Sequence, residues 1–328
     1  MDAEAAETSE AVIAEDPLAP AFGPRDLGGT GAVVSPIGID GAVFGWIVGG
    51  DETVEILDAF AAGGGNLIST ADHYAGGRSE VMIGSWLRTV KDRASIVIET
   101  RVGRHPDAAG LGKRSILRAV ENSLTRLGTD YIDFLSFDGE DDRTPIEESI
   151  ETAQRLIDSG VVRYLSAARF SADRIKEVAR IAAASSAPSF RVILAEYSLM
   201  DRGYYESRLQ PIAVDLGRGA IAHMPLANGY LTGRFRTRDE LPPSVIYDGA
   251  VRHMGRRGDR VLEALVPVAA ELGETPTRVA LAWVLVKPGI AAAVVRVTDA
   301  DQVAEAVGAA GVRLARHHVA LLDRVSTT

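Results

Sequence analysis

The feature that most constrains the fold is a regular alternation of short apolar runs with longer amphipathic segments from Val33 onward. Such alternation is the pattern of repeated strand–helix units around a parallel sheet. The strands we predict are Gly41–Trp46, Asn66–Ser69, Ile96–Thr100, Tyr131–Ser136, Val162–Ala167, Arg191–Glu196, Ala220–Met224 and Ile290–Val295.

Capping residues predict where three of the intervening helices begin and end. Thr144 is an N-cap candidate because a proline follows it and a glutamate stands three residues on, and Gly160 is placed to end that helix. Ser115 is predicted to cap a second helix that Gly128 closes, and Thr275 to cap a third that also starts with proline.

Eight parallel strands can form a closed barrel or an open doubly wound sheet. An open sheet that binds a dinucleotide should carry G-x-G-x-x-G at its first strand–helix turn. The glycine groups at residues 28–31 and 63–65 lack that spacing, and we interpret them as a turn and a helix end. We therefore predict a closed barrel.

Composition limits the organisation and the partners of the chain. Its 328 residues, 46% hydrophobic, support one large domain over residues 26–328, preceded by an acidic, disordered tail over residues 1–25. A net charge of −10 argues against binding to nucleic acid or to an anionic membrane. The absence of cysteine excludes disulfides and thiolate chemistry. With no signal sequence and no long apolar run, we expect a cytoplasmic protein, and the preference for arginine over lysine suggests a bacterial source.

Several segments from about residue 34 to residue 325 match one family in their order, spacing and residue types. They are STADHYAGGRSEVMIGSWL, SIVIETRVG, SLTRLGTDYIDFLSFDGEDDRTPIEESI, SGVVRYLSAARFS, AEYSLMDR, MPLANGYLTGRF and TPTRVALAWVLVKPGI. Together they resemble the aldo-keto reductase family. The resemblance implies a (β/α)8 TIM barrel with its site at the C-terminal ends of the strands.

In that family NADPH delivers hydride to a carbonyl while a tyrosine donates a proton. The pKa of the tyrosine is lowered by a lysine that pairs with an aspartate, and a histidine orients the substrate. The resemblance places the tyrosine at Tyr74, but it places Ser69 at the aspartate position, Arg101 at the lysine position and Asp138 at the histidine position. Three of the four groups are thus exchanged.

These exchanges change the chemistry that the site can perform. Arg101 stays protonated, so it is either a fixed cation for the substrate or an ion-pair partner of Glu99 in the barrel wall. Asp138 is predicted to act as a general base, the alternative being a solvated acidic loop.

The positions that hold the cofactor in the family have changed as well. Arg169 stands where a carboxamide should dock, so it is a candidate for binding a substrate carboxylate or phosphate, or for capping the next element. His223 replaces the aromatic residue that stacks on nicotinamide, and it is an acid–base candidate or a core histidine. Leu231, Gly233 and Gln302 are the cofactor-binding candidates that remain. No metal-ligand spacing is present among the histidines.

Three hypotheses of function remain. The first is an enzyme that needs no cofactor and performs acid–base chemistry, a dehydration, isomerisation or cyclisation, on a polar metabolite that is anionic or carries a carbonyl. There Tyr74, Asp138, Arg101 and His223 are the catalytic set and Arg169 and Ser69 bind substrate. The second is an NADPH-dependent reductase with an unusual tetrad. The third is a barrel without catalysis that binds a ligand or a protein partner, with the acidic tail as a docking arm.

Overall fold

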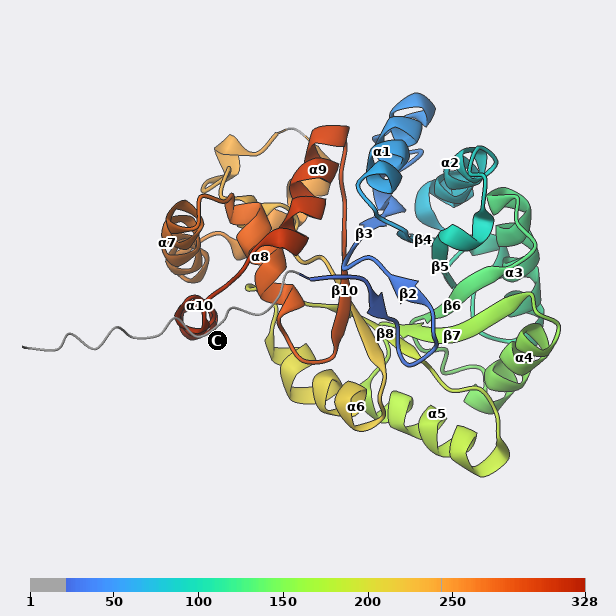
Figure 1. The fold of residues 1–328 in the computed structure, drawn as a ribbon. Helices are drawn as coiled ribbons and strands as arrows, with labels where there is room; N and C mark the ends of the chain where they lie inside the picture. Colours follow the sequence, from blue (N-terminus) through green and yellow to red (C-terminus); the bar gives the residue numbers. More distant parts are fainter. Residues whose placement is uncertain (1–21, 243, 328) are drawn as a thin grey trace, which may run out of the picture.

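Eight parallel strands close into a barrel in the order β10-β3-β4-β5-β6-β7-β8-β9 (Figure 1). This computed structural model describes residues 22–242 and 244–327. The barrel strands are β3 (Ile37–Asp40), β4 (Leu67–Ala71), β5 (Val97–Val102), β6 (Ile132–Asp138), β7 (Val162–Ala168), β8 (Val192–Glu196), β9 (Gly219–His223) and β10 (Ile290–Val295). The predicted closed (β/α)8 barrel is confirmed.

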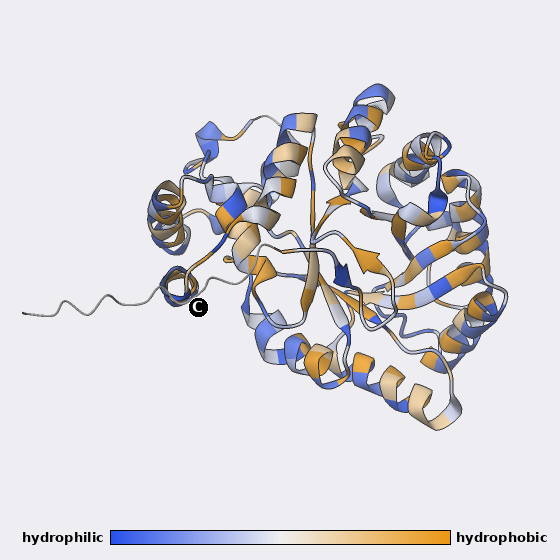
Figure 2. Cartoon of the chain, viewed as in Figure 1, coloured by the Kyte–Doolittle hydropathy of each residue, from blue (hydrophilic) through white to orange (hydrophobic). Residues whose placement is uncertain are grey.

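Helices surround the barrel, apolar and polar residues alternate along them (Figure 2), and their buried apolar residues contribute to the core. The α-helices are α1 (Gly50–Ala62), α2 (Arg78–Leu87), α3 (Lys113–Leu127), α4 (Ile146–Asp158), α5 (Ala172–Ser185), α6 (Gln210–Asp215), α7 (Arg256–Glu271), α8 (Pro276–Leu285), α9 (Ala300–Gly308) and α10 (Arg316–Ser326). None of the helices in the described residues combines the length and the apolar character needed to cross a bilayer.

The first barrel strand was predicted too late in the chain. Instead of Gly41–Trp46, the strand is β3, and Gly41–Val43 form a 3-10 turn that Asp40 caps through Ala42 N–H. Gly38 lets β3 approach β4 closely, because a Cβ at this position would lie 2.8 Å from the carbonyl oxygen of Leu67. The correction puts Asp40 at the C-terminal end of a barrel strand.

Two of the three predicted N-caps are also wrong. Helix α4 begins at Ile146, and the hydroxyl of Thr144 instead donates to the carboxylate of Asp141. Ser115 lies inside α3, where its hydroxyl donates to Ala109 O. Thr275 caps α8 as predicted, accepting from Arg278 N–H.

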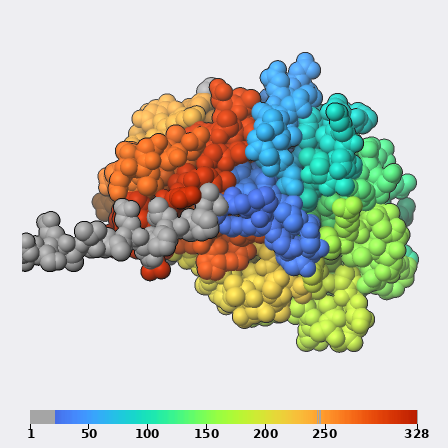
Figure 3. Space-filling model, viewed as in Figure 1, coloured from blue at the N-terminus to red at the C-terminus, as the bar shows by residue number. Residues whose placement is uncertain are grey.

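The N-terminal end of the barrel is sealed by a small hairpin of β1 (Arg25–Asp26) and β2 (Val33–Val34), coloured blue at the centre of Figures 1 and 3. Leu27 in its turn is fully buried among apolar side chains of the barrel interior, and Arg25 donates to two carbonyls near β10. A ligand therefore has to enter from the opposite end of the barrel. Of the predicted tail, residues 1–21 lie outside the described residues, whereas Phe22 N–H donates to Ala310 O at 2.8 Å.

Candidate active site

Side chains from three strand ends converge on one buried carboxylate, Asp40, at the end of β3, which is 1% exposed. Nε2 of His223, the last residue of β9, lies 3.0 Å from Asp40 Oδ2. Nε of Arg296, which follows β10, also lies 3.0 Å from Oδ2, and Arg101 from β5 reaches Oδ1 at 3.4 Å. Parallel strands bring their carboxyl ends to one face of a barrel, which explains how residues so far apart in the chain meet.

These partners fix the ionisation of the cluster. Burial alone would raise the pKa of Asp40, but His223, Arg296 and Arg101 outweigh it and hold that pKa well below its usual range. Burial lowers the pKa of His223 below 6.5, an effect that Asp40 only partly offsets. Because an ionised carboxylate only accepts hydrogen bonds, Nε2 of the neutral imidazole carries the proton, and Nδ1 is left as a base.

Arg101 is the most enclosed cation of the site. Its Nε donates to Thr70 O at 3.0 Å and lies 3.9 Å from a Glu99 oxygen, while a terminal nitrogen lies 3.3 Å from Ser69 Oγ. Burial by itself would lower its pKa, but Tyr74, Glu99 and Asp40 raise it above the ordinary value. The ion pair with Glu99 that we considered for Arg101 is therefore present. The predicted role of Arg101 as a cation facing substrate has little free guanidinium surface to support it.

Ser69 and Glu99 lie beneath Arg101 inside the barrel, and both are fully buried. Ser69 Oγ donates to Glu99 Oε2 at 2.5 Å. Burial raises the pKa of Glu99, and Arg101 counters this only in part. Ser69, a predicted substrate-binding residue, therefore bonds to Glu99 and Arg101 below the mouth of the barrel.

Tyr74 stands at the mouth on a tight turn that its sequence makes possible. Ala75, Gly76 and Gly77 all have positive φ angles, a conformation that the two glycines adopt without strain. The guanidinium carbon of Arg101 lies 4.9 Å from the centre of the tyrosine ring, so the cation packs against the face of the ring. Burial raises the pKa of Tyr74 to about 12, although Arg101 opposes the rise.

A second charged group surrounds Asp138, the last residue of β6, which is 5% exposed. Arg169, whose φ of 56° lies in the left-handed region, forms an ion pair with it. His73 Nδ1 lies 4.0 Å from Asp138 Oδ2 and 3.4 Å from the buried carboxylate of Asp72. The His73 ring is 5.0 Å from that of Tyr74. The structure thus brings Tyr74, Arg101 and His223 around Asp40, and sets Asp138 and Arg169 beside them.

Asp40 and Arg296 are central to the site, yet we did not predict a role for either. Asp40 directly follows an apolar run, and a carboxylate at the C-terminal end of a barrel strand is a strong indication of a site. The misplaced first strand hid that signal. Arg296 carried a similar signal, as the residue after the last predicted strand.

A groove lies beside the site, between the loops after β9 and β10 and helix α9. Thr232, Thr298 and Gln302 are among the residues that line it, with Asp40 and Arg296 at its inner end. Of the predicted cofactor-binding residues, Gln302 faces this groove. Leu231 is fully buried, and Gly233 does not line the groove.

The polar groups of this groove fit the phosphates of NADPH poorly. Its two arginines are both paired within the described residues, Arg234 with Glu305 at 3.4 Å and Arg296 with Asp40. The N-terminus of α9, which would suit a phosphate, is capped by the carboxylate of Asp299, which accepts from Gln302 N–H at 2.8 Å. Phosphate binding needs free donors, and each arginine of the groove already uses a donor on a carboxylate of the protein.

Comparison with known families agrees with the fold. The aldo/keto reductase family model matches residues 41–327, which is most of the chain and includes Tyr74, Arg101, Asp138 and His223. The chain therefore belongs to the aldo/keto reductase family.

Proposed function

We propose that this barrel catalyses acid–base chemistry without a redox cofactor on an anionic metabolite that carries a carbonyl group. The class of reaction is removal of a proton from the carbon next to the carbonyl, as in an isomerisation, dehydration or cyclisation. The observation that carries the proposal is the pair formed by Asp40 and His223 at 3.0 Å, held among buried cations.

In the proposed reaction His223 removes the proton. Nδ1 accepts the proton from carbon, and the electron pair of the broken C–H bond moves to the carbonyl oxygen. The ionised Asp40 holds the ring through Nε2–H and stabilises the imidazolium that forms. Asp138, the other base that we considered, is neutralised by Arg169, which makes it the weaker candidate.

In the same reaction Tyr74 stabilises the negative charge that develops on the carbonyl oxygen. A phenol with a pKa of about 12 stays protonated at neutral pH and donates a hydrogen bond to the developing enolate. In a reductase of this family, by contrast, the resemblance implies a tyrosine whose pKa is lowered by a lysine. The raised pKa supports a hydrogen-bonding role for Tyr74 over that of a readily ionised proton donor.

The test is proton exchange in the absence of any nicotinamide nucleotide. The protein is incubated with a panel of 2-oxo-, 4-oxo- and 5-oxo-carboxylates in D2O, and deuterium incorporation next to the carbonyl is followed by NMR. We expect incorporation above the buffer rate for members of the panel. Absence of exchange across the panel, or exchange that requires added NADPH, would contradict the proposal.

A second candidate function, NADPH-dependent reduction, is favoured by the groove that Gln302 lines. Because the cations of that groove are paired and α9 is already capped, we expect millimolar NADPH to leave the Tm and the tryptophan fluorescence unchanged. The measurement is a thermal shift combined with a fluorescence titration. A saturable shift of the Tm with quenching would favour the reductase over the acid–base enzyme.

A further inference from the structure

A second cavity opens at the mouth of the barrel, and its lining shares no residue with that of the groove. It lies between the loops after β7 and β8 and the first turn of α7. Its apolar lining includes Phe170, Leu194 and Met200, each at least nine-tenths buried, and Tyr204 stands exposed at its rim. Arg169 lines it as well, so the cavity reaches the charged group around Asp138.

The acidic residues of this cavity all have partners. Glu140 accepts from Ser171 N–H at 2.6 Å and lies 3.4 Å from Arg174. Arg252 lies 3.6 Å from Glu196 and 3.4 Å from Asp201. The carboxylates of the lining are therefore neutralised by cations of the protein.

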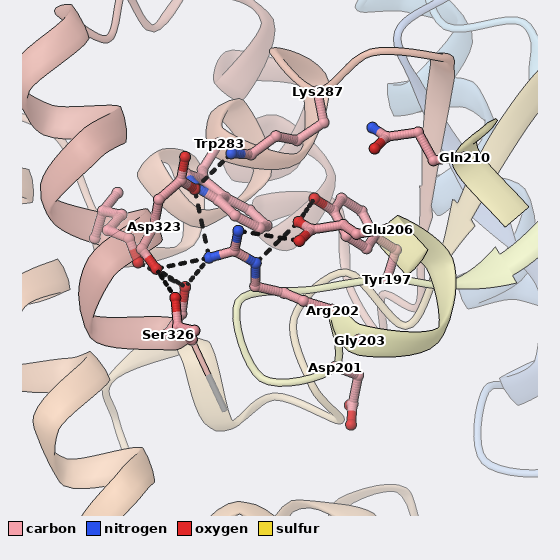
Figure 4. Close-up of polar contacts among 12 residues, drawn as sticks. Tyr197, Asp201, Arg202, Gly203, Glu206, Gln210, Trp283, Lys287, Asp323 and Ser326 are labelled. Carbon is pink, nitrogen blue, oxygen red and sulfur yellow. Dashed lines mark hydrogen bonds and ion pairs between the residues drawn. The ribbon is translucent and has the colours of Figure 1, made fainter. Parts of the chain in front are cut away.

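Arg202, one of the arginines of the lining, is likewise bound to groups of the protein. It binds both oxygens of Glu206, at 2.9 and 3.1 Å, and donates to Ser326 Oγ and Asp323 O of helix α10 (Figure 4). Asp201, its neighbour in the loop, points away from this network (Figure 4). Arg202 thus links the loop that lines the cavity to helix α10, and few of its donors are left for a ligand.

Arg257 differs from the other cations of the cavity. One terminal nitrogen donates to Ser326 O at 3.1 Å, which holds the side chain in place. Its Nε is buried without a hydrogen-bond partner, and no carboxylate of the described residues lies within 4.0 Å of its guanidinium. Arg257 is also the second residue of α7, a 16-residue helix whose N-terminal dipole adds positive potential.

We propose that this cavity binds the carboxylate of a ligand with a short apolar chain, and that Arg257 is its charged contact. The apolar lining accommodates the chain, and the guanidinium, which has a carbonyl but no carboxylate as its partner in the described residues, donates to the acid group. The ligand is then the acidic end of the substrate, a step that rests on the proposed acid–base function. This assignment of the cavity narrows the substrate class to oxo-acids whose carboxylate is separated from the carbonyl by an apolar spacer.

The experiment measures binding alone and does not depend on turnover. Hexanoate and its neutral analogue hexanamide are titrated into the full chain by calorimetry, with the wild type and the Arg257→Gln and Arg256→Gln variants. Arg256 is the matched control, since it is exposed, begins the same helix and does not line the cavity. We expect hexanoate to bind the wild type and Arg256→Gln alike, and Arg257→Gln roughly 10- to 100-fold more weakly.

Equal binding of hexanoate by all three proteins, or equal binding of hexanoate and hexanamide by the wild type, would overturn the proposal. If Arg257→Gln fails to fold, the comparison of hexanoate with hexanamide in the wild type still decides. Arg257→Lys, which keeps the charge, should retain part of the affinity. Selective hexanoate binding without proton exchange would uphold the cavity and refute the proposed reaction, so the two failures are distinguishable.

Discussion

Replacing Asp40 with asparagine is expected to lower the free energy of unfolding by about 3–5 kcal/mol. The substitution keeps the shape of the side chain but removes the negative charge that Arg296 and Arg101 share. Two largely buried guanidinium groups would then face a neutral amide, and an uncompensated buried charge is far more costly than a lost surface ion pair. Urea denaturation at pH 7, followed by circular dichroism, measures the change.

Asp92→Asn provides the matched control for this experiment. Asp92 caps a short 3-10 helix through the same type of bond, accepting from Ala94 N–H, but it is exposed and takes part in no ion pair of the described residues. Asparagine is as good an N-cap as aspartate, so this variant should change stability by less than about 0.5 kcal/mol. Equal stability of the Asp40 and Asp92 variants would show that the charge on Asp40 does not hold the cluster together.

The pH dependence of the Asp40 variant gives an independent check. The folded-state pKa of Asp40 is depressed, so its contribution is complete above the ordinary value of 3.8 and is lost as the pH falls through the lower folded-state value. The stability difference between the wild type and Asp40→Asn should therefore be constant near neutral pH and shrink in strong acid. Because Asp40 also favours the protonated ring of His223, the difference first increases as that ring is protonated, and only a difference that stays undiminished in strong acid would contradict the assigned ionisation of Asp40.

The sequence predicted the architecture well because the barrel repeats one local pattern. Each strand is a short apolar run with helix-forming sequence after it, so seven of the eight strands fall where the periodicity places them. The exception, β3, is short and is followed by glycine- and aromatic-rich sequence that resembles a strand. The N-cap predictions at Thr144 and Ser115 were wrong because each hydroxyl bonds to another group. Which group a hydroxyl bonds to depends on tertiary contacts.

The candidate site was less predictable, because its charged groups come into contact only when the strands close into a barrel. The sequence could nominate Tyr74 and His223 one at a time, but no local pattern says that Asp40 will hold His223 from 183 positions away. The same holds for Arg169, whose pairing with Asp138 follows from β6 and β7 being neighbours in the barrel. These pairings decide which groups are bases and which are neutralised.

Replacing His223 with glutamine is expected to slow deuterium exchange of the oxo-carboxylate substrate by 10²–10⁴-fold, roughly the contribution of a positioned general base. Glutamine can still donate a hydrogen bond to Asp40, so the fold and the charge cluster should persist while the base is lost. Exchange rates measured by NMR, with circular dichroism to verify folding, separate the two effects. His317→Gln is the control, because that side chain is 70% exposed and lies outside the site, and its rate should match the wild type.

The wild-type pH profile follows from the same residue. Burial holds the pKa of His223 below 6.5, and only the neutral ring can accept a proton. The exchange rate should therefore be level at neutral pH and fall on acidification with a midpoint below 6.5, and this acid limb should be absent from the residual rate of His223→Gln. An unchanged rate with an unchanged acid limb in the variant would remove His223 from the mechanism and would leave Asp138, freed from Arg169 by substrate, as the base to test.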